Sequence, residues 1–318
     1  MADDRAAYRG VEDRAVACYT EERYEDGVGL LRDAMPQLPS WRADLAHLAA
    51  CLLGAAGRPA EALAELRSAF DAGGWWHRRI LVDDDDLASL RDLPGFADLV
   101  ERSHARALAA GTATRPPLIQ RPAGAARGVL VALHGAGEDA DDAIAAWSAA
   151  VAAGFVLLAP DSSQRNTPTY RSWPDPDAGL RDIAAALAAL PAGDQGLPLI
   201  AGGFSAGGRQ AILWALAGEP GRPAGFVAVA PAIGPAHLDP TQFTAAVARG
   251  VTGTVLLGEQ DDDVRDDALP AIDGLRRAGL RCALTLLPGL AHAFPTDFPD
   301  RLHNTRELTV IRASLKSL

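Results

Sequence analysis

Ser205 lies in a pattern of small residues that could make it a nucleophile. The residues from Gly203 to Gly207 read Gly-Phe-Ser-Ala-Gly, with an apolar run over 197–203 before the serine and a helix-like stretch over 206–217 after it. A serine at a sharp turn from a strand to a helix has a strained backbone, and larger side chains in place of the glycines would clash. The pattern predicts a reactive serine at the end of a strand. The alternative is a glycine-rich surface turn.

Ser205 needs a base, because a serine hydroxyl is by itself a poor nucleophile. The histidines that follow it in the chain are His237, His292 and His303. His292 follows the last expected strand, in a loop that could direct its imidazole across the strand ends. His237 precedes the loop that offers an acid and so breaks the usual chain order of serine, acid and histidine, whereas His303 lies in an expected terminal helix. We therefore predict His292 as the base rather than an ordinary surface histidine.

Several acids follow the penultimate expected strand and could orient that histidine. The stretch from Leu257 to Val264 contains Glu259, Asp261, Asp262 and Asp263. Adjacent side chains leave the backbone in different directions, so at most one of these acids can be buried against the imidazole while the others meet solvent. The residues alone leave the choice among the four acids open.

An acyl-transfer reaction also needs N–H donors for the oxygen that gains negative charge. The backbone N–H of Ala206, at the start of the helix after Ser205, is one candidate. The loop from His134 to Gly137, after the first strong strand, resembles the oxyanion loop of lipases and esterases, which implies the N–H of Ala136 as the second. We expect His134 itself to be structural or to line the pocket.

The candidate residues follow strand-like runs that alternate with helix-like stretches from residue 128 onward. Such alternation predicts a doubly wound, mostly parallel sheet with helices on both faces, and ligands bind at the carboxyl ends of its strands. The expected strands are 128–135, 154–161, 197–203, 225–230, 254–257 and 281–287, and the expected helices are 142–153, 179–190, 206–217, 266–278 and 300–316.

The segment from about 115 to 318 resembles the α/β-hydrolase superfamily. It is most similar to the phospholipase/carboxylesterase and dienelactone hydrolase branches. The resemblance implies the α/β-hydrolase fold. It also implies a serine carboxylesterase or thioesterase activity without a metal or an organic cofactor. The matching motifs are Leu133 to Gly137, Gly203 to Gly208, Gly258-x-x-Asp261-x-x-Val264 and His292.

The resemblance also selects an acid. Asp261 lies three residues after Gly258 and three before Val264, which matches the hydrolase pattern, so Asp261 is the implied partner of His292. The chain departs from the family where the sheet begins, because little sequence precedes the first strong strand. We expect the leading antiparallel strands to be absent or reduced to residues 117–121.

Apolar residues near these motifs are candidates for an acyl pocket, although ordinary core packing explains them equally well. They are Phe204, Trp173, Trp214, Ile233 and Phe294.

The chain before the catalytic segment has a different character. Residues 1–110 show helical periodicity, residues 111–127 form a linker or a leading strand, and 128–318 is the expected catalytic domain. Residues 23–34 align on 58–69 with a constant offset of 35, and this resembles the tetratricopeptide repeat. Such a region is either a protein- or peptide-binding groove or a helical cap, and we favour the cap because no surplus of charged or aromatic residues marks a groove.

Composition excludes several classes of protein. The net charge of −11 makes nucleic acid and anionic membranes poor partners, and no apolar run approaches the roughly 18 residues that span a bilayer. The three cysteines show no CxxC spacing, so we expect buried thiols and neither a disulfide framework nor a zinc site. We expect a cytoplasmic enzyme with a small-molecule ester or thioester substrate.

Two other classes of function use the same residues. An acyltransferase or cyclase would form the same acyl-enzyme on Ser205 but exclude water, and an inactive hydrolase fold would serve only as a binding scaffold. Peptidase activity is less expected, because the sequence offers neither a propeller-like partner domain nor a secretion signal.

Overall fold

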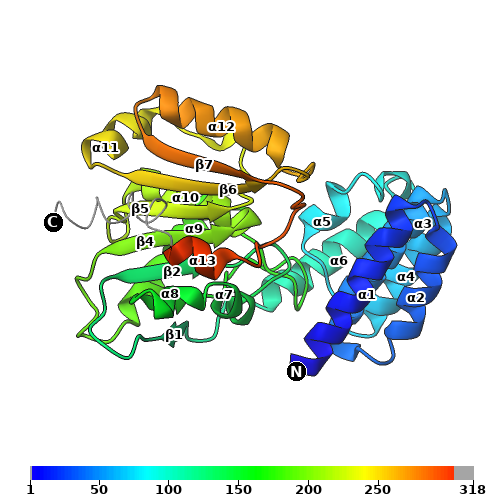
Figure 1. The fold of residues 1–318 in the computed structure, drawn as a ribbon. Helices are drawn as coiled ribbons and strands as arrows, with labels where there is room; N and C mark the ends of the chain where they lie inside the picture. The colour runs from blue at the N-terminus through cyan, green and yellow to red at the C-terminus, as the bar shows by residue number, and fades with distance from the viewer. Residues whose placement is uncertain (1, 304–318) are drawn as a thin grey trace. The chain divides into compact units, whose positions relative to one another are not determined.

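The computed structural model describes residues 2–303 (Figure 1). Within these residues the chain forms two compact units. The helical unit consists of residues up to Thr112 together with Arg165–Tyr170. The sheet unit consists of Ala113–Gln164 and the residues from Arg171 onward. None of the helices in the described part is both long and apolar enough to cross a membrane.

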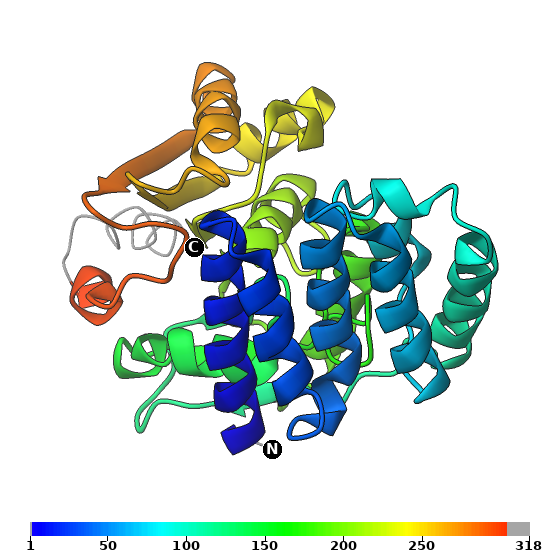
Figure 2. The ribbon, with the colours of Figure 1, turned by 90° about the vertical axis from the view of Figure 1, so that its right-hand side faces the viewer.

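The helical unit contains helices that pack on their neighbours in sequence order, α1 on α2, α2 on α3 and α3 on α4 (Figure 2). The two segments of the internal repeat, 23–34 and 58–69, fall on α2 and α4, so the repeating element is a pair of helices. The helices are α1 (Ala2–Thr20), α2 (Tyr24–Ala34), η1 (Pro39–Trp41), α3 (Arg42–Ala55), α4 (Pro59–Asp71), α5 (Arg78–Val82), η2 (Ala88–Leu90) and α6 (Phe96–Ala109).

Gly27 shows why small residues recur where these helices meet. A Cβ atom on Gly27 would lie 2.8 Å from Cδ1 of Leu52 and 3.1 Å from Cβ of Cys18. The equivalent position of the second repeat is Ala62, whose side chain is fully buried. Helix α2 can therefore approach its neighbours only because position 27 carries no side chain.

The sheet unit is built on seven strands in the order β1-β3-β2-β4-β5-β6-β7 (Figure 1). All neighbours are parallel except β1, which runs antiparallel to β3. The strands are β1 (Leu118–Gln120), β2 (Val129–Leu133), β3 (Val156–Ala159), β4 (Leu199–Phe204), β5 (Gly225–Val229), β6 (Thr252–Gly258) and β7 (Arg281–Leu287). This confirms the predicted mostly parallel sheet, and β1 is the short leading strand expected near 117–121.

Helices cover both faces of the sheet, as two consecutive glycines of β4 demonstrate. A Cβ on Gly202 would meet the ring of Trp147 at 3.2 Å, whereas one on Gly203 would meet the backbone of Gly207 in α10. Successive residues of a strand point to opposite faces, so one face lies against Trp147 and the other against α10. The helices are α7 (Ala140–Ala146), α8 (Ala149–Ala152), α9 (Pro176–Ala188), α10 (Ser205–Ala217), η3 (Pro235–His237), η4 (Pro240–Gln242), α11 (Phe243–Ala248), α12 (Arg265–Arg277) and α13 (Phe298–His303).

Two expected helices differ from the structure. The helix expected over 142–153 is divided into α7 and α8, and the break coincides with Trp147, whose side chain is fully buried against Phe298. The helix expected over 300–316 is described only as α13, and the remainder of that prediction lies outside the described residues.

The segment Arg165–Tyr170 is the main difference from the domain boundaries expected from the sequence. It follows β3 in the chain, but it packs in the helical unit. The carbonyl of Asn166 accepts the N–H of His77 at 2.7 Å, and the hydroxyls of Thr167 and Thr169 donate to the carboxylate of Asp44. Burial of Asp44 raises its pKa to about 6. Hydrogen bonds between distant parts of the chain therefore hold this segment, and no local pattern predicts them.

Deleting residues 1–110 should remove the hydrogen-bond partners of this segment but none of the seven strands. We expect the truncated protein to keep the β-sheet signal in its circular dichroism spectrum and to unfold cooperatively. Trypsin should cleave it after Arg165 much faster than it cleaves the full chain, because the segment loses its contacts. Limited proteolysis followed by mass spectrometry measures this. Equal cleavage of the two proteins, or a truncated protein that does not fold, would contradict the expectation.

Candidate active site

Ser205 lies at the turn from β4 to α10, in a backbone conformation that few residues adopt. Its φ angle is +51°, in the left-handed region that is costly for a residue with a side chain. A Cβ on Gly203 would lie 2.1 Å from the carbonyl oxygen of Gly207, and one on Gly207 would lie 2.3 Å from that of Leu133. The two glycines flanking Ser205 are therefore required sterically, as the sequence pattern indicated.

The side chains of Asp261, His292 and Ser205 form a hydrogen-bonded chain. Nδ1 of His292 lies 3.0 Å from Oδ2 and 3.1 Å from Oδ1 of Asp261, and Nε2 lies 3.0 Å from Oγ of Ser205. A carboxylate only accepts, so Nδ1 carries the hydrogen and Nε2 presents a lone pair to the serine hydroxyl. The structure thus brings together the three side chains that were predicted, in the arrangement that activates a hydroxyl nucleophile.

Burial separates Asp261 from the other acids of its loop. The side chain of Asp261 is 0% exposed, whereas that of Asp262 is 84% exposed and pairs with Arg265 at 3.1 Å. Asp263 and Glu259 are also exposed. Among the four acids that the sequence left open, only Asp261 is buried against the imidazole.

The loops that carry Asp261 and His292 meet through backbone contact. The N–H of Gln260 donates to the carbonyl of Leu290 at 2.9 Å. A Cβ on Gly258, at the end of β6, would lie 2.3 Å from the same carbonyl oxygen. A glycine at position 258 therefore allows the acid loop and the histidine loop to approach to hydrogen-bonding distance.

The backbone N–H groups of Ala136 and Ala206, the expected oxyanion donors, are available to an external acceptor. Within the described residues, the N–H of Ala136 donates to no protein acceptor, and Ala136 is exposed. The N–H of Ala206, in the first turn of α10, has no intrahelical acceptor. A Cβ on Gly207 would lie 2.4 Å from the carbonyl oxygen of His134, so the loop with Ala136 lies against the start of α10.

Buried hydrogen bonds hold the loop that carries Ala136. Nε2 of His134 accepts the N–H of Ser162 at 3.1 Å, so Nδ1 carries the hydrogen and donates to the carbonyl of Gly135 at 2.7 Å. The indole N–H of Trp173 donates to the carbonyl of His134 at 2.8 Å. His134 is 1% exposed, and burial lowers its pKa to about 4. It is a neutral structural residue, which is one of the two roles expected for it.

Glu138 is a positioning residue that the sequence reasoning did not identify. One of its carboxylate oxygens accepts the N–H of Gly135 at 2.6 Å, which closes the turn around Ala136. The only signal in the sequence was an acid three residues after Gly135, in a turn already rich in acids.

The five apolar residues proposed for the pocket divide into two groups. Trp173, Trp214 and Ile233 are at most 1% exposed and belong to the core of the sheet unit, so they offer no surface to a substrate. Phe204 and Phe294 are half-buried, and the ring of Phe204 lies 5.3 Å from the imidazole of His292. Of the five, only these two keep exposed surface, and their rings contact each other beside His292.

Two family models match this chain. The model of the A/B hydrolase-like N-terminal domain matches residues 7–111, and the model described as serine aminopeptidase S33 matches residues 124–268. The chain has the α/β-hydrolase fold, preceded by an N-terminal helical region. No curated protein matches it.

Solved structures share the fold of this α/β-hydrolase at low sequence identity. An uncharacterized protein from Bacillus cereus ATCC 10987 is 22% identical with a TM-score of 0.50, and the match covers 94% of this chain and 97% of that one. Acyl-protein thioesterase 2 from Zea mays is 21% identical with a TM-score of 0.50, and the match covers 63% of this chain and 99% of that one. Similarity at this level supports the fold alone.

The buried His134 should make the stability of the hydrolase depend on pH. Its folded pKa of about 4 lies below its ordinary value of 6.5, so in this range the unfolded chain binds a proton that the folded protein excludes. Stability should therefore fall as the pH falls, by up to about 3 kcal/mol from this group. Urea unfolding of the wild type and of His134→Gln across this range measures the effect, which should be smaller in the variant. The exposed His237→Gln serves as the control, and identical pH profiles for all three proteins would refute the assignment.

Proposed function

We propose that this α/β-hydrolase cleaves a carboxylic ester or thioester through an acyl-enzyme on Ser205. The observation that carries the proposal is the hydrogen-bonded chain from Asp261 through His292 to Ser205, with a serine held at positive φ at the start of α10. Ester hydrolysis requires a nucleophile, a base and donors for an oxyanion, and the site supplies candidates for all three.

In the first step, Nε2 of His292 accepts the proton of Ser205 as Oγ attacks the substrate carbonyl. The imidazole becomes positively charged, and the buried carboxylate of Asp261 stabilises that charge and keeps the ring in its orientation. The direction of the hydrogen bonds in the resting enzyme already matches this transfer, so the base needs no change of tautomer.

The carbonyl oxygen of the substrate gains negative charge when Oγ adds to the carbon. The backbone N–H groups of Ala136 and Ala206 are the proposed donors for this oxyanion. The hydrogen bonds of His134 and Glu138 fix the loop around Ala136 before the substrate arrives, so little reorganisation is needed during the reaction.

The tetrahedral intermediate then collapses, and the alcohol or thiol leaves with the proton that His292 carries. Water enters, His292 takes a proton from it, and the resulting attack on the acyl-enzyme releases the acid and regenerates Ser205. The two half-reactions use the same base and the same N–H donors. An apolar acyl group would be favoured by the half-buried rings of Phe204 and Phe294 beside the histidine.

An aminopeptidase is the second candidate, because the family model that matches residues 124–268 is described as serine aminopeptidase S33. Amide and ester cleavage share the acyl-enzyme, so the substrates distinguish them. Rates on an aminoacyl p-nitroanilide and on a p-nitrophenyl ester, measured with the same enzyme, compare the two. Addition of an alcohol or amine acceptor tests for acyl transfer in the same assay, through the products formed.

Ser205→Ala should abolish labelling by a fluorophosphonate and reduce kcat on short activated esters by several orders of magnitude, about 10⁶ where such a serine has been removed from a serine protease. The side chain acts only in the chemistry, so the thermal unfolding of the variant should match that of the wild type. Peptide mapping of the labelled protein identifies the modified residue. The exposed Ser148→Ala is the control, and a Ser205→Ala enzyme with wild-type rate would show that another residue is the nucleophile.

Asp261→Asn should lower kcat by about 10⁴, because the amide no longer holds the productive tautomer of His292 or stabilises its charged form. Asp262→Asn should lower kcat by less than about tenfold, since its carboxylate is solvated and pairs only with Arg265 on the surface. Steady-state kinetics of both variants on one ester make the comparison. A large loss in Asp262→Asn alone would show that Asp262, and not Asp261, is the acid that orients His292.

A further inference from the structure

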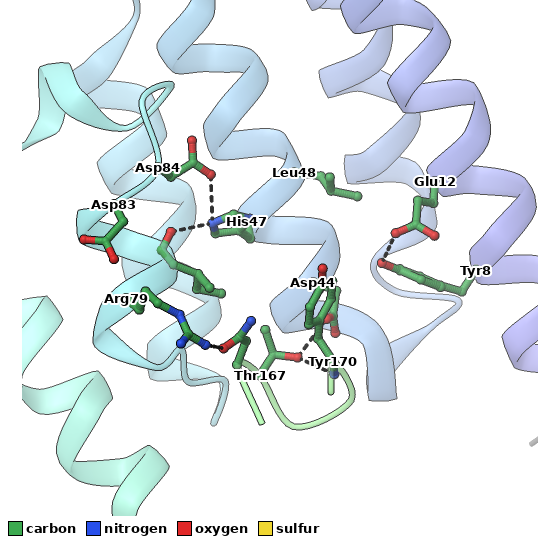
Figure 3. Close-up of a pocket in the computed structure, with 12 residues that line it drawn as sticks. Tyr8, Glu12, Asp44, His47, Leu48, Arg79, Asp83, Asp84, Thr167 and Tyr170 are labelled. Carbon is green, nitrogen blue, oxygen red and sulfur yellow. Dashed lines mark hydrogen bonds and ion pairs between the residues drawn. The ribbon is translucent and has the colours of Figure 1, made fainter. Parts of the chain in front are cut away.

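The helical unit contains a cluster of three side chains that the proposed reaction does not use. His47 and Cys51 lie one turn apart on α3. Asp84 reaches His47 from the loop after α5 (Figure 3). The Sγ atom of Cys51 is 3.4 Å from Oδ2 of Asp84 and 3.8 Å from Nδ1 of His47. Oδ2 of Asp84 is also 3.6 Å from Nε2 of His47.

The hydrogen bond of His47 to the backbone determines which ring nitrogen faces the cluster as an acceptor. Nε2 lies 3.0 Å from the carbonyl oxygen of Ile80, and a carbonyl oxygen only accepts. Nε2 therefore carries the hydrogen, and Nδ1 presents its lone pair on the side of Cys51. The cluster then consists of an imidazole lone pair, a carboxylate and a sulfur, with only the thiol proton among them.

We propose that His47, Cys51 and Asp84 bind a divalent transition metal ion of the zinc type. Imidazole nitrogen, thiolate sulfur and carboxylate oxygen are the donors that zinc takes in proteins. Zinc bonds of about 2.0 to 2.3 Å at tetrahedral angles would separate neighbouring ligand atoms by about 3.3 to 3.6 Å. The distances of 3.4 Å and 3.8 Å from Sγ are within a few tenths of an ångström of that range, and all three ligand atoms lie within 4.8 Å of one another.

Neighbouring backbone groups hold the ligands in orientations suited to a metal. The carbonyl of Ile80 fixes the ring of His47, as hydrogen bonds to the second nitrogen do in histidine-bound metal sites. The N–H of Asp86 donates to Oδ1 of Asp84 at 3.0 Å, which leaves Oδ2 directed at Cys51. Two of the three ligands are therefore held in place before an ion binds.

The charges of the ligands match those of a divalent ion. A bound zinc ion would replace the proton of the Cys51 thiol, which would leave for solvent, and the thiolate and the carboxylate of Asp84 would then balance the charge of the ion.

A cavity of about 460 Å³ adjoins the cluster within the helical unit (Figure 3). His47 and Asp84 are among the residues that line it, together with Tyr8, Asp44, Arg79 and Tyr170. Cys51 is buried and does not line it. The fourth position of a tetrahedral ion would therefore face the cavity and hold water or a small ligand, as in sites that keep one position open.

Metal content of the purified full-length protein tests the proposal. After removal of metals and incubation with zinc, the protein should retain one equivalent through gel filtration. With cobalt in place of zinc, the visible spectrum should show tetrahedral d–d bands and a thiolate-to-cobalt charge-transfer band. Retention of no zinc, or a cobalt complex without the charge-transfer band, would overturn the proposal on the wild-type protein alone.

Matched variants locate the site. Cys51→Ser and Asp84→Asn should each weaken zinc binding by at least about tenfold, since each removes a ligand. Cys18→Ser changes another buried cysteine of the same unit, and Asp83→Asn changes a neighbouring acid, so both should bind zinc like the wild type. A second group of possible ligand atoms, one each from Asp261, Asp263 and His292, also lies within 4.8 Å of one another. Zinc bound at that second group would still bind to Cys51→Ser. Unchanged binding in Cys51→Ser would therefore refute the site, and circular dichroism shows whether each variant is folded.

Discussion

The turn from β4 into α10 has no room for a side chain at Gly203 or Gly207, and the rest of the candidate site depends on this steric constraint. The absence of a side chain at Gly203 and Gly207 lets the helix begin directly at the end of β4 and against the carbonyls of Leu133 and His134. That contact brings the first N–H groups of the helix beside the loop with Ala136. The absence of a side chain at Gly258 likewise lets the loop with Asp261 contact the loop with His292. Glycine thus allows three loops to converge at backbone contact around one serine hydroxyl.

The parts of this arrangement that depend on local sequence could be predicted from it. Strands β2 to β6 are almost entirely buried and read as largely apolar runs. The turn at Ser205 requires its glycines wherever it occurs. Asp261 is a different case, because four acids stand within five positions and only burial distinguishes them. The resemblance to a family motif was needed to choose it. Its isolation from solvent in the structure supplies the physical reason.

Features that depend on distant contacts could not be predicted. An apolar side chain looks the same in a sequence whether it packs in a core or lines a pocket, so Trp173 and Trp214 were proposed for the pocket although they are buried. Asp84 lies 33 residues from Cys51, which conceals any metal pattern, and the segment 165–170 gives no sign of its place in the helical unit. The cytoplasmic location and a peptide partner for the helical unit stay predictions.

The buried carboxylate of Asp44 accepts hydrogen bonds from Thr167 and Thr169. It makes the stability of the helical unit depend on pH. Its folded pKa of about 6 exceeds its ordinary value of 3.8, so between these values the folded helical unit holds a proton that the unfolded chain releases. The helical unit therefore loses stability as the pH rises through this range, which is opposite in sign to the effect of His134 on the sheet unit. Acidification therefore destabilises the sheet unit through His134 and stabilises the helical unit through Asp44. The part of the molecule that opens first on denaturation can thus differ between weakly acidic and neutral solution.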